Sequence, residues 1–102
     1  MILADFSIVP LGKGESLSRP VSAILKIIDG SGLDYRFHSM GTTVEGEWDE
    51  VFGLIKRCFE KMKKFSGRVS LTVKVDYRKG AKSRLESKIK SVETKLGKKL
   101  KT

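Results

Sequence analysis

The sequence is poor in the side chains that bind metals or form cross-links. Its 102 residues include one cysteine, Cys58, and one histidine, His38. One cysteine cannot form an internal disulfide, and this pair cannot supply the ligands of a zinc finger or an iron–sulfur cluster. The composition therefore predicts a protein that needs neither a metal nor another cofactor to fold.

Long apolar runs are missing as well. No stretch approaches the roughly 20 apolar residues of a membrane-spanning helix. The first ten residues contain neither a basic leader nor a small-residue cleavage site. We therefore expect a cytoplasmic protein without a membrane partner. A chain of this length supports one hydrophobic core, which predicts a single domain over residues 1–102.

Acidic residues are the minority among the charged side chains, with 12 Asp and Glu against 21 Lys and Arg, a net charge of +9. The imbalance is concentrated after Arg78, where nine basic residues accompany only Glu86 and Glu93. Such a segment is typical of a solvated helix face, an anion-binding arm or a fraying tail. We favour the solvated face and keep a nucleic-acid-binding module as the alternative function.

The hydrophobic pattern switches between the periods of strands and helices. Alternation predicts strands over residues 2–9, 33–38, 43–45 and 69–77. Apolar spacings of three and four predict helices over residues 19–29, from 47 to about 64, and over about 81–97. We expect Pro10 to end the first strand and Ser18 to cap the first helix. The order β-α-β-β-α-β-α predicts an α+β, ferredoxin-like sheet with two helices on one face and an additional C-terminal helix.

The same pattern predicts which side chains are buried. The middle helix is expected to bury Val51, Leu54, Ile55, Cys58 and Met62. The sheet face without helices is expected to be polar and either solvated or in contact with another subunit. Its members would be Asp5, Ser7, Arg36, His38, Thr43, Glu45, Thr72, Lys74 and Asp76. Exposed sheet edges and an unpartnered apolar stripe on the last helix favour self-association.

Two motifs resemble those of a known family. Pro10 to Ser18 read PLG-x-G-x-S-x-S, and Met40 to Glu47 read MGT-x-x-EGE. With RVSLTVKVDYRKG ahead of a lysine-rich helix, the sequence resembles the thiamine-binding, YkoF-like family of small archaeal and bacterial proteins over nearly its whole length. The resemblance implies a ferredoxin-like fold, assembly into dimers or tetramers, and binding of thiamine or its pyrimidine part, near a subunit interface.

The motif residues suit a small-molecule pocket. Glycines let the backbone approach a ligand, serines and helix N–H groups donate hydrogen bonds, and carboxylates favour the thiazolium cation of thiamine. The predicted ligand-binding residues are Ser7, Gly12, Gly14, Ser16, Ser18, Met40, Gly41, Thr42, Thr43, Glu45 and Glu47. The competing interpretation is structural: the glycines shape a turn, the serines cap a helix, and Glu47 complements a helix dipole.

Signs of catalysis are weak. GKGES lacks the G-x-x-x-x-G-K-[ST] pattern of a phosphate-binding loop, and no nucleophile–base pair is evident. His38 could pair with Asp5 or Glu45 or simply be solvated, and Cys58 is expected to act as a small hydrophobe. The strand over 69–77 lacks the aromatic pair that stacks RNA bases. We therefore expect a binding protein and not an enzyme, with nucleic acid as an unlikely partner.

Overall fold

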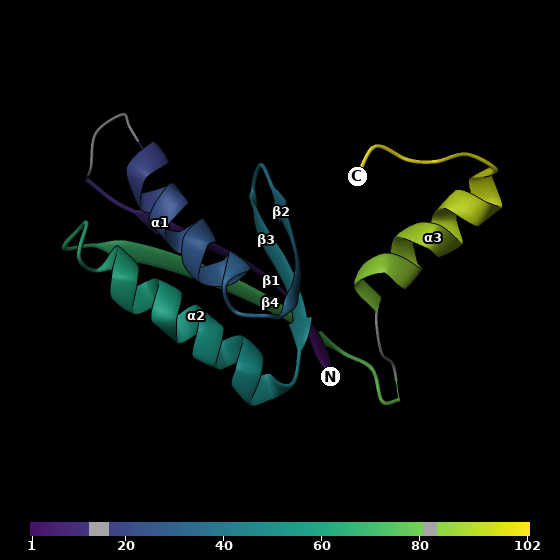
Figure 1. Cartoon of the computed structure of the whole chain (residues 1–102), viewed down its shortest axis with the longest axis horizontal. Helices are drawn as coiled ribbons and strands as arrows, with labels where there is room; N and C mark the ends of the chain where they lie inside the picture. The colour runs from purple at the N-terminus through teal and green to yellow at the C-terminus, as the bar shows by residue number, and fades with distance from the viewer. Residues whose placement is uncertain (13–16, 81–83) are drawn as a thin grey trace.

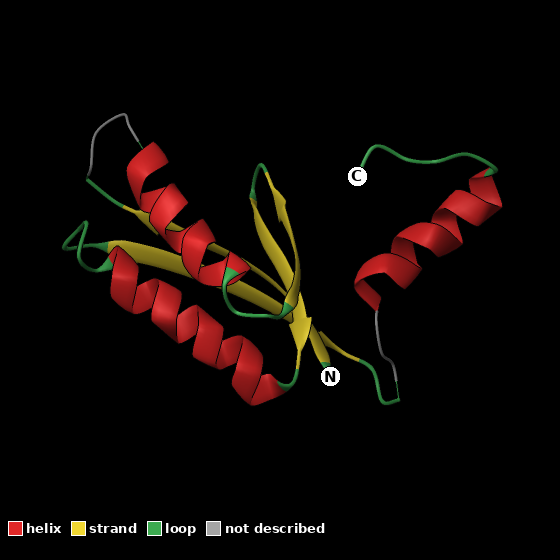
Figure 2. Cartoon of the chain, in the orientation of Figure 1, coloured by secondary structure: helices red, strands yellow, loops and turns green. Residues whose placement is uncertain are grey.

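The computed structural model describes residues 1–12, 17–80 and 84–102. The elements, in chain order, are β1 (Ile2–Pro10), α1 (Ser18–Asp29), β2 (Asp34–His38), β3 (Gly41–Gly46), α2 (Trp48–Met62), β4 (Val69–Tyr77) and α3 (Arg84–Leu96). This order confirms the α+β, ferredoxin-like fold (Figure 2). None of the helices in the described ranges is long and apolar enough to cross a membrane.

The four strands form one antiparallel sheet in the order β2-β3-β1-β4. β1 lies in the middle, but its two neighbours differ in extent. It pairs with β4 from Ile2 to Pro10, whereas its register with β3 ends where Phe6 lies opposite Thr42. β1 ends at Pro10 as predicted, with Pro10 itself the last paired residue, opposite Val69.

Helices α1 and α2 cover one face of this sheet (Figure 1). The apolar residues of β1 that face them, Ile2, Ala4 and Phe6, are buried. All five α2 residues predicted to be buried are buried: Val51, Leu54, Ile55, Cys58 and Met62. Period-two and helical spacings thus identified the core correctly, because burial of these stripes drives the packing of the layers.

Helix α1 begins one residue earlier than expected. Ser18 is its first helical residue and Leu17 takes the N-cap position, so the prediction of a Ser18 cap was wrong. The Leu17 carbonyl accepts the first helical hydrogen bond, 3.0 Å from the Val21 nitrogen. Pro20 then falls in the first turn, where its missing N–H has no intrahelical partner to lose.

Helix α3 lies on the other side of the sheet from α1 and α2 (Figure 1). Its start is fixed by polar contacts: the backbone N–H of Arg84 donates to the Glu45 carboxylate at 2.7 Å, and the Arg84 guanidinium donates to the Asp76 carboxylate at 2.9 Å. Glu45 is therefore only 3% exposed. This corrects its predicted place on an open face, because α3 covers that end of the sheet.

Candidate ligand-binding pocket

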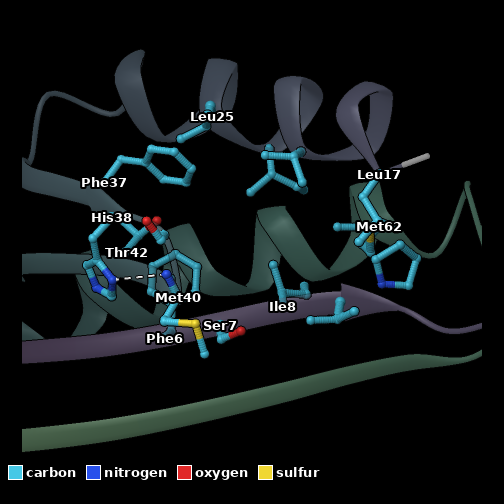
Figure 3. A pocket seen from close by; sticks show the side chains of 16 residues that line it. Phe6, Ser7, Ile8, Leu17, Leu25, Phe37, His38, Met40, Thr42 and Met62 are labelled. Atoms are coloured by element: carbon cyan, nitrogen blue, oxygen red, sulfur yellow. Dashed lines mark hydrogen bonds between the residues drawn. The ribbon is translucent and has the colours of Figure 1, made fainter. Parts of the chain in front are cut away.

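A pocket of about 190 Å³ lies between α1, the second half of β1 and the turn that joins β2 to β3 (Figure 3). Residues 6–10 of β1 form its floor, and residues 37–42 of the β2–β3 hairpin form one wall. Leu17 and three apolar side chains of α1 form the opposite wall, and Met62 of α2 contributes at the base. The lining is mostly apolar, as is usual for small-molecule sites.

The pocket exists because two adjacent strands have different lengths. β1 continues to Pro10, whereas β3 begins only at Gly41, which is close to Phe6. Beyond Phe6, the sheet therefore lacks a β3 strand on one side of β1. α1 spans this gap, and Ile8 on the floor stays only partly buried.

His38 lines the hairpin end of the pocket, and its hydrogen bonds extend to Asp5 on the opposite face of the sheet. The His38 Nδ1 atom accepts a hydrogen bond from the Met40 N–H at 3.3 Å, drawn as a dashed line in Figure 3. Its Nε2 atom lies 3.1 Å from the Asp5 carboxylate, which also accepts from the Thr43 hydroxyl at 3.4 Å. Because Nδ1 is an acceptor, this network assigns the proton to Nε2. Of the alternatives that the sequence left open for His38, the contact with Asp5 is present, and the side chain is also partly exposed.

The mouth of the pocket carries exposed apolar side chains. Phe37 is 54% exposed and Met40 is 81% exposed, although both line the pocket. An exposed aromatic ring beside a cavity offers a face to a cationic group. The mouth of the pocket is therefore apolar and open to solvent.

Four of the predicted ligand-binding residues meet in this pocket. Ser7 comes from β1, and Met40, Gly41 and Thr42 come from the hairpin. Gly41 has a close contact that explains its type: a side-chain carbon there would lie 2.6 Å from the Phe6 carbonyl oxygen. The second motif thus contributes its first three residues to the pocket.

The other predicted residues are placed differently. Gly12 and Ser18 lie close in sequence to residues that line the pocket but are not part of its lining. Thr43 faces Asp5 on the other side of the sheet. Glu45 is buried under α3. Gly14 and Ser16 lie outside the described residues.

Glu47 lies at the far end of β3 and has a structural role. It is the N-cap of α2, where its backbone N–H donates to the Glu50 carboxylate at 3.0 Å in a capping box. The carboxylate of Glu47 lies 3.7 Å from the N-terminal ammonium of the chain. For Glu47, the structure therefore favours the structural interpretation, although its role is in a capping box and not only as a charge beside the helix dipole.

Sequence reasoning missed most of the apolar lining. Ile8, Leu25 and Phe37 fit the strand and helix patterns of the sequence, and Leu17 belongs to the loop before the first helix. None of the four was predicted to line a pocket. A signal was available in the predicted lengths, because the strand over 2–9 was expected to be much longer than its neighbour over 43–45. Strands of unequal length leave a gap beside the longer one.

The single cysteine is isolated from the pocket. Cys58 is fully buried in the core, and burial raises the pKa of its thiol to about 11. The thiol therefore remains protonated at neutral pH and is a poor nucleophile. Across residues 1–12, 17–80 and 84–102 there is no group of three or more His, Cys, Asp and Glu side chains placed to hold a metal ion.

Comparison with known proteins identifies relatives over nearly the whole chain. The model of a family described as "Thiamine-binding protein" matches residues 4–93. The UPF0045 protein sll0230 of Synechocystis is 35% identical over 94 residues, covering 91% of this chain and 78% of the relative. The UPF0045 protein YqgV of Bacillus subtilis is 34% identical over 102 residues, covering 94% of this chain and 98% of the relative.

A solved structure confirms the fold. The crystal structure of the hypothetical protein MJ1052 from Methanocaldococcus jannaschii superposes with a TM-score of 0.82 at 32% identity. The superposition covers 89% of this chain and 94% of that protein.

Proposed function

Because the chain belongs to the thiamine-binding protein family, we propose that it binds thiamine or a related aminopyrimidine in the pocket between α1 and the β2–β3 turn. The observation that carries the proposal is the pocket itself. It is an apolar cavity with polar groups at the hairpin end, and four residues singled out from the sequence line it. A flat heteroaromatic ring needs this combination of apolar walls and a few polar groups.

The size of the pocket favours one ring. A volume of about 190 Å³ is below the roughly 300–1,000 Å³ that is usual for drug-sized ligands. The pyrimidine would occupy the cavity, and the thiazolium would extend through the mouth. There the Phe37 ring offers a cation–π contact to the thiazolium. The sequence had predicted that the carboxylates of Glu45 and Glu47 would lie beside this cation.

The positive net charge of the chain opposes a cationic ligand only weakly at this place. Much of the excess charge belongs to α3 and the residues after it, and α3 lies on the other side of the sheet. Salt screens such charges over about 8 Å at physiological ionic strength. A phosphorylated thiamine would be opposed still less.

We propose binding without chemical conversion. Both ring nitrogens of His38 are engaged by Met40 and Asp5, and Cys58 is buried with a raised thiol pKa. Each of these two groups would need to be released before it could act as a base or a nucleophile.

Titration calorimetry with thiamine, its pyrimidine fragment and its diphosphate tests the proposal. We expect saturable binding of at least one of the three. Leu25→Trp would fill the pocket from α1 and should weaken that binding at least about tenfold, equivalent to about 1.4 kcal/mol. Ser22→Trp places the same side chain on the exposed face of the same helix and should leave binding unchanged. The absence of heat with all three compounds in folded protein would overturn the proposal, as would unchanged affinity in Leu25→Trp.

Self-association into a dimer or tetramer stays a prediction. The apolar stripe of α3 is buried at Leu85, but Val92 and Leu96 are 46% and 59% exposed. This outer part of the stripe would be covered by a second copy of the chain. Light scattering at micromolar concentration tests it, and a monomer would contradict it.

The nucleic-acid alternative gains little from the structure. Two cations near the start of α3, Arg84 and Lys88, both contact the Asp76 carboxylate at 2.9 Å. Charges that are neutralised within the protein are less available to phosphates. A salt titration of oligonucleotide binding would detect any contribution from the remaining lysines.

A further inference from the structure

The peptide group of Ile8 is a polar feature on the floor of the pocket, and its direction follows from the geometry of β1. In an antiparallel sheet, the N–H and C=O of one residue point to the same side, and successive residues alternate sides. The Leu11 N–H donates to the Arg68 carbonyl at 2.8 Å, at the base of β4. The Phe6 carbonyl lies instead beside Gly41, the first residue of β3. Even-numbered residues of β1 therefore direct their peptide groups away from β4.

Pro10 supports the same assignment independently. It has no N–H, yet it lies inside β1 opposite Val69 of β4. Proline is tolerated within a sheet where its nitrogen faces a side without a partner strand. Pro10 has the same parity as Ile8, so both nitrogens face the side away from β4.

That side of β1 has a neighbour only along its first half. The pairing with β3 ends at Phe6, and no strand in the described part of the chain pairs with Ile8 there. Ile8 lines the pocket between α1 and the hairpin. The N–H and C=O of Ile8 therefore project from the edge of β1 where the pocket replaces a strand.

We infer that the N–H and C=O of Ile8 form the recognition edge of the pocket, the part that selects the ligand. This edge would bind a ligand that has a hydrogen-bond acceptor and a donor side by side. The Ile8 N–H would donate to a ring nitrogen, and the Ile8 carbonyl would accept from the amino group on the adjacent ring carbon. An aminopyrimidine has this pair, so it would stand in for the missing β3 residue, as peptides do when they extend a sheet. This inference rests on the proposed function and deepens it by naming the ligand edge that is recognised.

The inferred role of the recognition edge predicts that the pocket selects pyrimidines that carry the amino group. A pyrimidine without the amino group cannot donate to the Ile8 carbonyl and leaves that acceptor without a partner in the complex. We expect the deamino analogue of the pyrimidine fragment to bind at least about tenfold more weakly to the unmodified protein, a difference of about 1.4 kcal/mol.

Two substitutions at one position separate the peptide group from the side chain. Ile8→Pro removes the N–H, and the orientation of Ile8 leaves the hydrogen bonds to β4 intact. Ile8→Ala also shortens the side chain but keeps the N–H. Calorimetry with the pyrimidine fragment should show Ile8→Pro binding at least about tenfold more weakly than Ile8→Ala. Equal affinities in two folded variants would overturn the inference.

The Ile8 amide can also be observed directly in the unmodified protein. In nitrogen–proton spectra, its proton should shift downfield on titration with the pyrimidine fragment and shift much less with the deamino analogue. This chemical shift tests the inference about the Ile8 peptide group even if Ile8→Pro fails to fold. Protein that binds none of the thiamine compounds overturns the proposed function and this inference together. Protein that binds the fragment and its deamino analogue equally, with no selective Ile8 shift, overturns only the inference.

Discussion

The two halves of β1 have the same alternating sequence but different surroundings. From Ile2 to Phe6 the strand lies between β3 and β4, and its inward side chains are buried. From Ser7 to Pro10 it pairs with β4 alone and forms the floor of the pocket. The first half uses its peptide groups and its apolar surface for folding, whereas the second half leaves part of both facing the pocket.

This comparison shows how a small fold makes room for a pocket. β3 begins at the hairpin turn beside Phe6 while β1 continues to Pro10, and this difference in length leaves the cavity. At the other end of the sheet, α3 reaches the strands, and Arg84 engages Glu45 and Asp76.

Truncating one isoleucine in each half gives the largest expected contrast. Ile2 is 5% exposed in the closed half, so Ile2→Ala should reduce the free energy of unfolding by about 2–4 kcal/mol. Ile8 is only partly buried and borders an existing cavity, so Ile8→Ala should cost on the order of 1 kcal/mol. Chemical denaturation of both variants measures the difference. Equal losses would show that the two halves are packed alike.

The glycine at the boundary between the halves is expected to have the next largest effect. In Gly41→Ala, the added carbon would lie 2.6 Å from the Phe6 carbonyl oxygen, so the hairpin must move away from β1. We expect a loss of about 1–3 kcal/mol and weaker ligand binding. Gly53→Ala in α2 is the control, since an added carbon there contacts nothing and a helix gains about 0.5–1 kcal/mol. Thermal denaturation of the two variants should give shifts of opposite sign.

The end of the sheet that is closed by α3 should respond to acid. The Lys88 side chain, with a further contribution from Arg84, lowers the pKa of Asp76 below its ordinary 3.8. A carboxyl with a lowered pKa stabilises the fold above its unfolded pKa, and this contribution is lost as the pH falls through the folded value. We therefore expect the amides of α3 to lose protection from hydrogen exchange below about pH 4.

Asp76→Asn tests whether this carboxylate is responsible. The variant should expose the α3 amides at neutral pH and remove the acid-dependent step, with little change at the pocket. Lys90→Ala is the matched control, because Lys90 and Glu86 are exposed and 3.9 Å apart. Unchanged exchange of α3 in Asp76→Asn would show that the remaining contacts of Arg84 suffice to hold the helix.

The pocket shows where prediction from the sequence stopped. The glycines and serines of the first motif predicted ligand contacts at residues such as Gly12 and Ser18, but the cavity is lined beside them by Pro10 and Leu17. An apolar side chain gives the same sequence signal whether it faces the core or a cavity. Glu45 was misplaced for a related reason: a carboxylate on a strand predicts a polar face, and only the approach of α3 buries it.

The sequence by itself determined the order of the elements and the faces that are buried, since both depend on local periodicity. The α2 stripe and the alternation of β1 needed no knowledge of distant residues. Only the tertiary structure decided where β3 stops relative to β1, which helix covers which end of the sheet, and which backbone groups remain without a strand. These depend on register between segments far apart in the chain, and register is fixed by packing that no local pattern records.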